Sequence, residues 1–347
     1  MKKETTIQLI IIFILTTILG VLLYTSKDYF TFNQRFNRFP FEEETEKDTK
    51  KEDIDNGKII TNKNIDLSNY DSNINIKNAG EYTITGEFNY SIIVDTEEQV
   101  ILNLNNVSIN SSVTAAIANV GNGELVINLL KDTINTLKDN GSSECDGALY
   151  SSGKLTINGL GKLNIYGNQE EGEGIATTDS DITINGGEIY IESKDDGLNA
   201  GGDNGGIIII NGGNIFIKAN GDGIDSNKDL IINGGSVYTV GSSIGGDAGI
   251  DTDGKFEING GNVIALGSDM LQNPDKSSSQ RYVSFTLKNK ISKNSEISLK
   301  DKDNNEIISF DSKDDFKTLI LSSDKIGDNI YYLYINDKKT DYSMSVK

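Results

Sequence analysis

Acidic side chains recur at matching places along this 347-residue sequence, and their type and spacing suit the binding of a metal ion. They accompany an apolar position that repeats along the chain, at Leu149, Ile175, Leu198, Ile224 and Ile250. The oxygen-bearing side chains near the last three of these positions are Asp195, Asp196, Asn199, Asp222, Asp225, Asp247 and Asp251. Carboxylate and amide oxygens favour Ca²⁺, and the absence of histidine removes the commonest ligand of transition metals.

The spacing of the repeats would bring these carboxylates close together. The apolar positions follow one another at steps of 26, 23, 26 and 26 residues, which is typical of stacked coils. Neighbouring coils lie about 4.8 Å apart, and two carboxylates at that distance repel by about 1 kcal/mol in water and by several times more at a half-buried site. Turn chemistry alone explains a single Asp-Gly pair. Carboxylates that recur at the same position of successive coils would repel one another, so their recurrence favours a calcium ion between the coils.

Aromatic side chains form a second column of candidates. Counted from the Asn-Gly turn of each repeat, Tyr190, Phe216 and Tyr238 occupy equivalent outward positions in successive repeats. Three stacked rings would make an apolar strip about 10 Å long, which suits two or three sugar rings. The alternative is that a neighbouring loop or the C-terminal segment covers the strip. We predict that these three residues bind carbohydrate.

The elements that must position both columns are short β-strands. Apolar residues alternate with period two, as in Leu230 and Ile232, and an Asn-Gly pair such as Asn233-Gly234 follows in every repeat. Asn-Gly also suits a hairpin, but hairpins do not explain the same strand set every 26 residues. The sequence therefore predicts an all-β, right-handed parallel β-helix of about eight coils over residues 58–267, with Asn stacked on Asn between coils.

The ends of the chain differ from the repeats. Residues 1–26 contain the uncharged stretch Ile7–Tyr24, which predicts a transmembrane anchor or a secretory signal and places the body outside the membrane. Residues 27–57 are charged and predict a flexible acidic linker. Residues 268–347 predict a small C-terminal β module or a cap on the last coil. Its five expected strands are 281–287, 296–299, 306–310, 318–321 and 329–335.

The overall charge limits the partners of this protein. The formal net charge is −20, which argues against binding to nucleic acid or to anionic membrane surfaces and allows cation binding. The single cysteine, Cys145, excludes a disulfide within the chain.

The amino-acid sequence of the repeats resembles that of a known family. The run DG-[IL]-x-[SA] followed by L-x-I-x-N-G-G-x-[IV]-[YF] is similar to bacterial secreted β-helix proteins that bind carbohydrate, and the stretches 100–147 and SFTL…ISLKDKDNNEIISF…TLILSS resemble the same family. The resemblance implies a shape related to pectate lyases, bound calcium and affinity for polysaccharides, including acidic ones. It supports Asp196, Asp222 and Asp225 as ligands. Gly147 and Ala248 depart from the acidic column and put its outermost positions in doubt.

These observations lead to one expected function and two alternatives. We expect a non-catalytic, calcium-dependent protein of the cell surface that binds a polysaccharide, either acidic or cellulose-like. One alternative is a polysaccharide lyase acting on uronate polymers, which needs Ca²⁺ and an Arg or Lys base. All three arginines fall outside the repeats, so the base would have to be Lys194 or Lys228, and surrounding carboxylates favour a charged lysine. The other alternative is a purely structural stalk or adhesin.

Overall fold

The computed structural model describes residues 63–140 and 145–346, which all belong to one compact unit, Gly57–Lys347. The predicted membrane anchor at Ile7–Tyr24 and the predicted linker at 27–57 lie outside the described residues. Among the described residues, no helix has the length and apolar character needed to cross a membrane.

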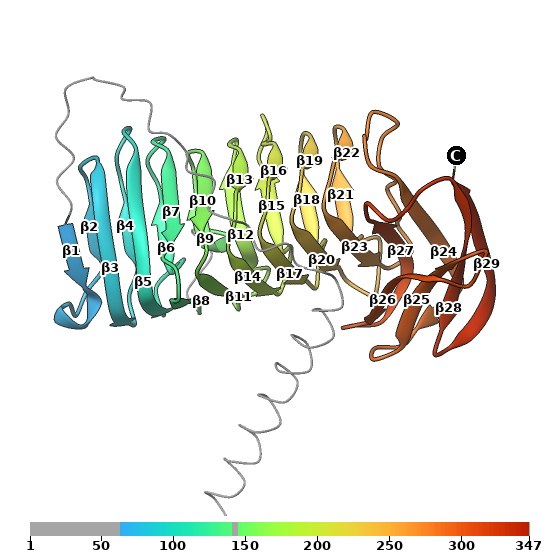
Figure 1. Ribbon diagram of the computed structural model, residues 1–347. Helices are drawn as coiled ribbons and strands as arrows, with labels where there is room; N and C mark the ends of the chain where they lie inside the picture. The colour runs from blue at the N-terminus through green and yellow to red at the C-terminus, as the bar shows by residue number, and fades with distance from the viewer. Residues whose placement is uncertain (1–62, 141–144, 347) are drawn as a thin grey trace, which may run out of the picture. The chain divides into compact units, whose positions relative to one another are not determined.

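The described chain is a parallel β-solenoid followed by a small antiparallel sheet (Figure 1). Each coil contributes one strand to an eight-stranded parallel sheet. Its strands are β2 (Ile74–Ile76), β4 (Ile92–Val94), β6 (Ile117–Asn119), β9 (Gly147–Ser151), β12 (Glu173–Thr178), β15 (Leu198–Gly201), β18 (Ile224–Ser226) and β21 (Ile250–Thr252). These eight strands correspond to about seven turns of the solenoid, close to the about eight coils that the sequence predicts.

The remaining strands of each coil belong to a 17-stranded sheet, which the Asn-Gly turns divide into two columns. The column before the turns contains β1 (Lys63–Asp66), β7 (Leu125–Leu129), β10 (Leu155–Gly159), β13 (Ile182–Ile184), β16 (Ile208–Ile210), β19 (Leu230–Ile232) and β22 (Phe256–Ile258). The column after them contains β8 (Ile134–Asp139), β11 (Lys162–Gly167), β14 (Glu188–Ser193), β17 (Asn214–Lys218), β20 (Ser236–Val240) and β23 (Asn262–Gly267). The long strands β3 (Gly80–Phe88) and β5 (Val100–Ser111) begin the solenoid, and the short 3₁₀ helix η1 (Leu67–Asn69) follows β1.

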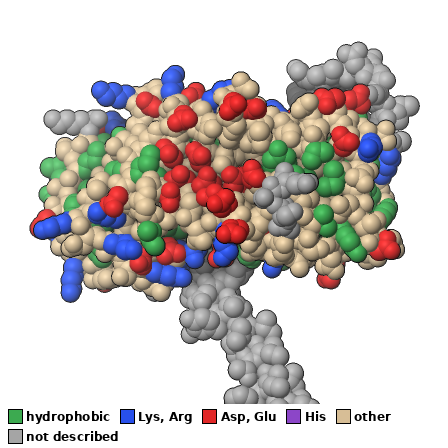
Figure 2. Space-filling model, turned by 180° about the vertical axis from the view of Figure 1, so that it is seen from behind, with side chains coloured by type: hydrophobic (Ala, Val, Ile, Leu, Met, Phe, Trp, Pro, Cys, Tyr) green, Lys and Arg blue, Asp and Glu red, His purple; other side chains and the backbone are tan. Residues whose placement is uncertain are grey.

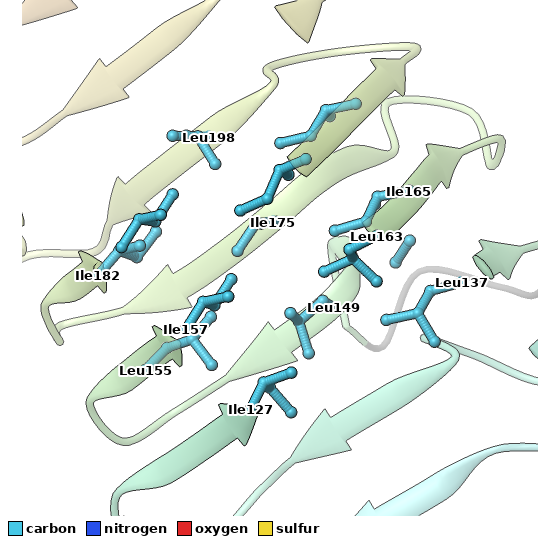
Figure 3. Close-up of a cluster of buried hydrophobic side chains, with 14 of the residues drawn as sticks. Ile127, Leu137, Leu149, Leu155, Ile157, Leu163, Ile165, Ile175, Ile182 and Leu198 are labelled. Atoms are coloured by element: carbon cyan, nitrogen blue, oxygen red, sulfur yellow. The ribbon is translucent and has the colours of Figure 1, made fainter. Parts of the chain in front are cut away.

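The repeating apolar positions fix the register of the stack. Leu198 pairs with Ile175 in the coil before it and with Ile224 in the coil after it, and Ile224 pairs with Ile250. Each of these side chains is buried, and all point into one continuous core that runs through the coils (Figure 3). Isoleucine and leucine suit this core because a parallel sheet buries its inner face completely. The predicted register is therefore confirmed.

A ladder of asparagine side chains runs along the turns between the two columns. Asn185, Asn211 and Asn233 each occupy the same corner of successive coils, and each Nδ2 donates to the Oδ1 of the preceding asparagine at 2.7–2.8 Å. The glycine two residues later supplies the left-handed backbone of the turn, with φ of 93° at Gly213 and 83° at Gly235. The ladder confirms the prediction that asparagine stacks on asparagine between coils.

Removal of one rung of this ladder is expected to destabilise the solenoid modestly. Asn211→Ala deletes two side-chain hydrogen bonds at an exposed corner, so the free energy of unfolding should fall by about 1–2 kcal/mol. Asn204→Ala, at an exposed loop position outside the ladder, is the matched control. Chemical denaturation of both variants would measure the difference, and equal stability of the two would contradict a stabilising role for the ladder.

The C-terminal residues form a module that is also a cap on the last coil. Strand β27 (Phe316–Ser322) pairs antiparallel with both β23 and β24 (Tyr282–Ile291), so it closes the open edge of the solenoid. The other strands form a four-stranded antiparallel sheet in the order β26 (Glu306–Asp311), β25 (Glu296–Asp301), β28 (Asn329–Ile335) and β29 (Lys338–Val346). The five predicted strands are present, and β29 is a sixth that the sequence analysis missed.

Candidate functional site

The carboxylates that the sequence singles out lie together on the solenoid. Asn199 on β15, Asp225 on β18 and Asp251 on β21 are direct neighbours across the eight-stranded sheet. The other four predicted ligands lie in the segments that lead into these strands: Asp195, Asp196, Asp222 and Asp247. Asp and Glu side chains gather in one dense patch on the face seen in Figure 2. We call the seven predicted ligands and Glu173 the acidic column.

Two of these carboxylates tie successive coils together. The Oδ1 of Asp196 accepts a hydrogen bond from the backbone N–H of Asp222 at 2.6 Å, and the Oδ1 of Asp222 accepts one from the backbone N–H of Ala248. The glycines that follow them allow this close approach, because a Cβ at Gly197 would lie 2.5 Å from the carbonyl oxygen of Gly223. One oxygen of each carboxylate is therefore used for structure.

Burial and mutual repulsion raise the pKa values of the innermost carboxyl groups. Burial is the larger cause at Glu173 and Asp196, which are only 8% and 9% exposed. Neighbouring aspartates raise both pKa values further, and the pKa reaches about 9 at Glu173 and about 8 at Asp196. A carboxylate in either place is unfavourable at neutral pH unless a proton or another cation compensates its charge.

The outer part of the acidic column shows the same effect to a smaller degree. Burial, followed by the charge of Asp251, raises the pKa of Asp222 to about 7 and that of Asp225 to about 6. Burial and the charges of Glu171, Asp247 and Asp146 raise the pKa of Asp195. Like charges thus accumulate over successive coils, as the repeat spacing predicts.

Glu173 is a member of this site that the sequence analysis did not select as a ligand. It occupies the same place in its coil as Asp196 and Asp222, two residues before the repeating apolar position. Its Oε1 accepts a hydrogen bond from the Nδ2 of Asn199, one of the predicted ligands in the next coil. Its position in the repeat was therefore the signal that could have identified it.

The donor chemistry of the acidic column fits Ca²⁺, but its side chains do not form a complete cage. The Oδ1 of Asn199 is buried and has no hydrogen-bond partner among the described residues, so a hard-oxygen ligand is available beside the carboxylates. Within the described part of the chain, however, no three His, Cys, Asp or Glu side chains converge closely enough to hold one metal ion. Backbone carbonyls or ligand oxygens would have to complete the coordination shell.

The aromatic column is stacked as its spacing predicts, but most of it is covered. The rings of Tyr190 and Phe216 are 5.2 Å apart and nearly parallel, and Phe216 and Tyr238 are 5.1 Å apart. Phe216 and Tyr238 are only 8% and 1% exposed. Phe310 packs its ring edge against Tyr238, and the backbone N–H of Lys313 donates to the Tyr238 hydroxyl.

The Tyr190 end of this column is less covered than the Tyr238 end. Tyr190 is half-buried and lies 6.0 Å from the ring of Tyr166, and Lys138 lies 4.5 Å above the Tyr166 ring. The sequence analysis did not select Tyr166 or Lys138. Tyr166 on β11 pairs with Glu192 on β14, and Lys138 on β8 pairs with Tyr166, so the repeat register could have pointed to both.

The lysines that a lyase would require lie beside the acidic column. Lys194 directly precedes Asp195, Lys228 follows β18, and both side chains are exposed. The arginine at position 281 lies outside the solenoid coils and pairs with Asp328. The described residues thus place two candidate bases at the margin of the site and no arginine within it.

Comparison with known proteins relates this chain to a carbohydrate-binding family. No curated protein matches the sequence significantly. A solved structure titled as the polysaccharide lyase-like protein from C. thermocellum, gadolinium derivative, is 22% identical and superposes with a TM-score of 0.43, covering 63% of this chain and 98% of that one. The family model of carbohydrate-binding domain-containing proteins matches residues 70–313, and the chain belongs to this family.

Proposed function

We propose that this protein binds an acidic polysaccharide through Ca²⁺ held on the acidic column, and that it does not cleave the polymer. The observation that carries the proposal is the alignment of carboxyl groups over successive coils, with Glu173 and Asp196 buried and Asp222 half-buried. Membership in a carbohydrate-binding family supports a polysaccharide as the partner. The seven residues chosen from the sequence, together with Glu173, are the proposed calcium ligands.

Bound Ca²⁺ would both attract an acidic polysaccharide and use oxygen ligands from it. The chain carries a formal charge of −20, so a polyanion can approach the acidic column only where bound cations reverse the local field. The acidic column lacks three convergent side chains, and a uronate carboxylate would supply oxygens that the protein does not. An ion shared between the protein and the polymer therefore suits both partners.

The exposed end of the aromatic column is proposed as an additional sugar contact. Tyr190 and Tyr166 present neighbouring rings, and such rings stack on the apolar face of a sugar regardless of its charge. We also predicted that Phe216 and Tyr238 bind carbohydrate. Both are buried, and Phe216 stacks directly on Tyr190, so we propose that they hold the Tyr190 ring in place instead.

The absence of turnover is proposed from the surroundings of the two lysines. β-Elimination requires a base that is positioned against the substrate, and an exposed lysine on a loop is not held in one position by its surroundings. Lys194 and Lys228 adjoin the acidic column and are exposed to water. We retain the lyase as the second candidate, since Lys194 directly precedes Asp195 and Lys228 follows Asp225 by three residues.

The proposed location follows from the N-terminal sequence. Ile7–Tyr24 has the length and composition of a membrane anchor, with Lys2 and Lys3 on its inner side. We propose a body that is held at the outer surface of the cell membrane, or secreted where this segment is cleaved. There it would meet extracellular polysaccharide.

Polysaccharide binding should depend on calcium and on the acidic column. Polygalacturonate is expected to bind more tightly in the presence of Ca²⁺ than in the presence of a chelator. Asp225→Asn should weaken binding by about tenfold or more, which corresponds to about 1.4 kcal/mol. Asp203→Asn, which removes the same charge from an exposed loop, is the control. Isothermal titration calorimetry would measure both, and equal effects would indicate diffuse electrostatics.

The same mixtures distinguish binding from the two alternatives. Ultraviolet absorbance of unsaturated oligouronides would reveal a lyase, and its loss in Lys194→Ala or Lys228→Ala would identify the base. A structural stalk would bind neither acidic nor cellulose-like polymers under any condition. Calcium-dependent binding without unsaturated product is the outcome that supports the proposal.

A further inference from the structure

The outward face of the C-terminal four-stranded sheet carries two half-buried tyrosine side chains. Along β28, Tyr331 and Leu333 are buried, whereas Tyr332 and Tyr334 alternate with them and lie on the opposite face. Ile330, on the same outward face, is 41% exposed. The family match ends at residue 313, so β28 and β29 lie beyond it.

Two lysines lie over these tyrosine rings. The Nζ of Lys339 on β29 is 3.4 Å from the centroid of Tyr332, and the Nζ of Lys300 on β25 is 4.8 Å from the centroid of Tyr334. In the strand register, Lys300 is opposite Tyr332 and Lys339 is opposite Tyr334, so each lysine reaches diagonally across the sheet. We call these four residues the tyrosine–lysine face.

The lysines can leave the rings at small cost. An exposed cation–π contact contributes only about 0.5–1 kcal/mol, and a negatively charged ligand offers each ammonium group a stronger partner. The phenol rings would then be free to stack against apolar sugar faces. The lysine ammonium group and the tyrosine ring of each pair would therefore both contribute to binding the same ligand.

The charges around this surface differ from those of the rest of the protein. Lys300 and Lys339 lie on the face itself, and Asp341 is an exposed carboxylate on β29 beside them. The formal charge of the whole chain is −20, so a pair of lysines beside two half-buried tyrosines stands apart from the acidic column. An anion that is repelled elsewhere finds complementary charge here.

We propose that the tyrosine–lysine face is a second glycan-binding site that takes anionic sugars without calcium. Two rings and two ammonium groups match a short stretch of a uronate polymer. Nucleic acid fits less well, because its affinity rests on several phosphate contacts and the chain as a whole is strongly acidic. The site does not rest on the acidic column, since it shares no residue with it.

The test uses the full chain, polygalacturonate and a chelator throughout, so that the calcium-dependent component is removed. Each of Tyr332→Ala and Tyr334→Ala is expected to weaken the residual binding by about two- to fivefold, and the double variant by about tenfold. Tyr332→Phe keeps the ring and should retain the affinity. Tyr70→Ala, at an exposed tyrosine outside this face, is the control for loss of a surface ring.

The charge requirement is tested on the same surface. The double variant Lys300→Gln and Lys339→Gln should lose binding to polygalacturonate, and Asp341→Asn should increase it. Fully methyl-esterified polygalacturonate should bind several-fold more weakly than the acid form. Unchanged affinity in the tyrosine or lysine variants, or equal binding of single-stranded poly(dT), would overturn the proposal. Loss of calcium-dependent binding alone would affect the proposed function and leave this site intact.

Discussion

Addition of Ca²⁺ at a hundredfold excess over its dissociation constant is expected to raise the free energy of unfolding by about 2.7 kcal/mol. The acidic column exists only in the folded chain, because stacking of the coils brings Asp225 beside Asp251 and Asp196 beside Asp222. An ion that binds there stabilises the native state alone and relieves the repulsion between neighbouring carboxylates. Thermal unfolding followed by circular dichroism should show a melting temperature several degrees higher with Ca²⁺ than with chelator.

Substitutions identify whether a defined site is responsible. Asp222→Asn and Asp225→Asn should each remove most of the calcium-induced shift, since the charge count of a site helps to set its affinity. Asp203→Asn should leave the shift unchanged because it lies on an exposed loop. Asp253 is a poorer control than its sequence position suggests, because its charge raises the pKa of Asp225. An identical melting temperature with Ca²⁺ and with chelator would contradict a calcium site. The acidic residues would then serve only to form turns.

In the presence of chelator, the free energy of unfolding is expected to fall by several kcal/mol as the pH rises from about 5 to about 9. The pKa is about 9 for Glu173, about 8 for Asp196 and about 7 for Asp222, whereas the ordinary values are 4.5 and 3.8. Between these limits the folded chain binds more protons than the unfolded chain, so raising the pH destabilises it. Each unit of pKa difference corresponds to about 1.4 kcal/mol.

Glu173→Gln tests the origin of this pH dependence. The variant removes the carboxyl group with the most strongly raised pKa while keeping its shape, so the loss of stability above pH 7 should become smaller. Glu306→Gln, at an exposed position of β26 in the C-terminal sheet, is the matched control. Urea denaturation across this pH range would measure both, and an identical pH dependence in the wild type and Glu173→Gln would show that the buried carboxyl group is not the cause.

Much of the fold and part of the site could be predicted because stacked parallel coils place equivalent residues of each repeat side by side. Once Leu198 and Ile224 are recognised as the same position, the pairings of Asn199 with Asp225 and of Tyr190 with Phe216 follow directly. Period-two alternation identified the strands and the buried side of each. Even Glu173, which was overlooked, occupies a position that the repeat assigns to an acidic residue.

The tertiary structure alone decided which of these columns a ligand can reach. Phe310 and Lys313 cover Tyr238 from a segment more than seventy residues away, and no periodic pattern links them. The pKa values of Glu173 and Asp196 likewise depend on burial by neighbouring coils, which spacing does not measure. Lys339 meets Tyr332 only because β29 folds back on β28. Repetition encodes contacts between like positions, whereas contacts between unlike segments arise only from the packing of the folded chain.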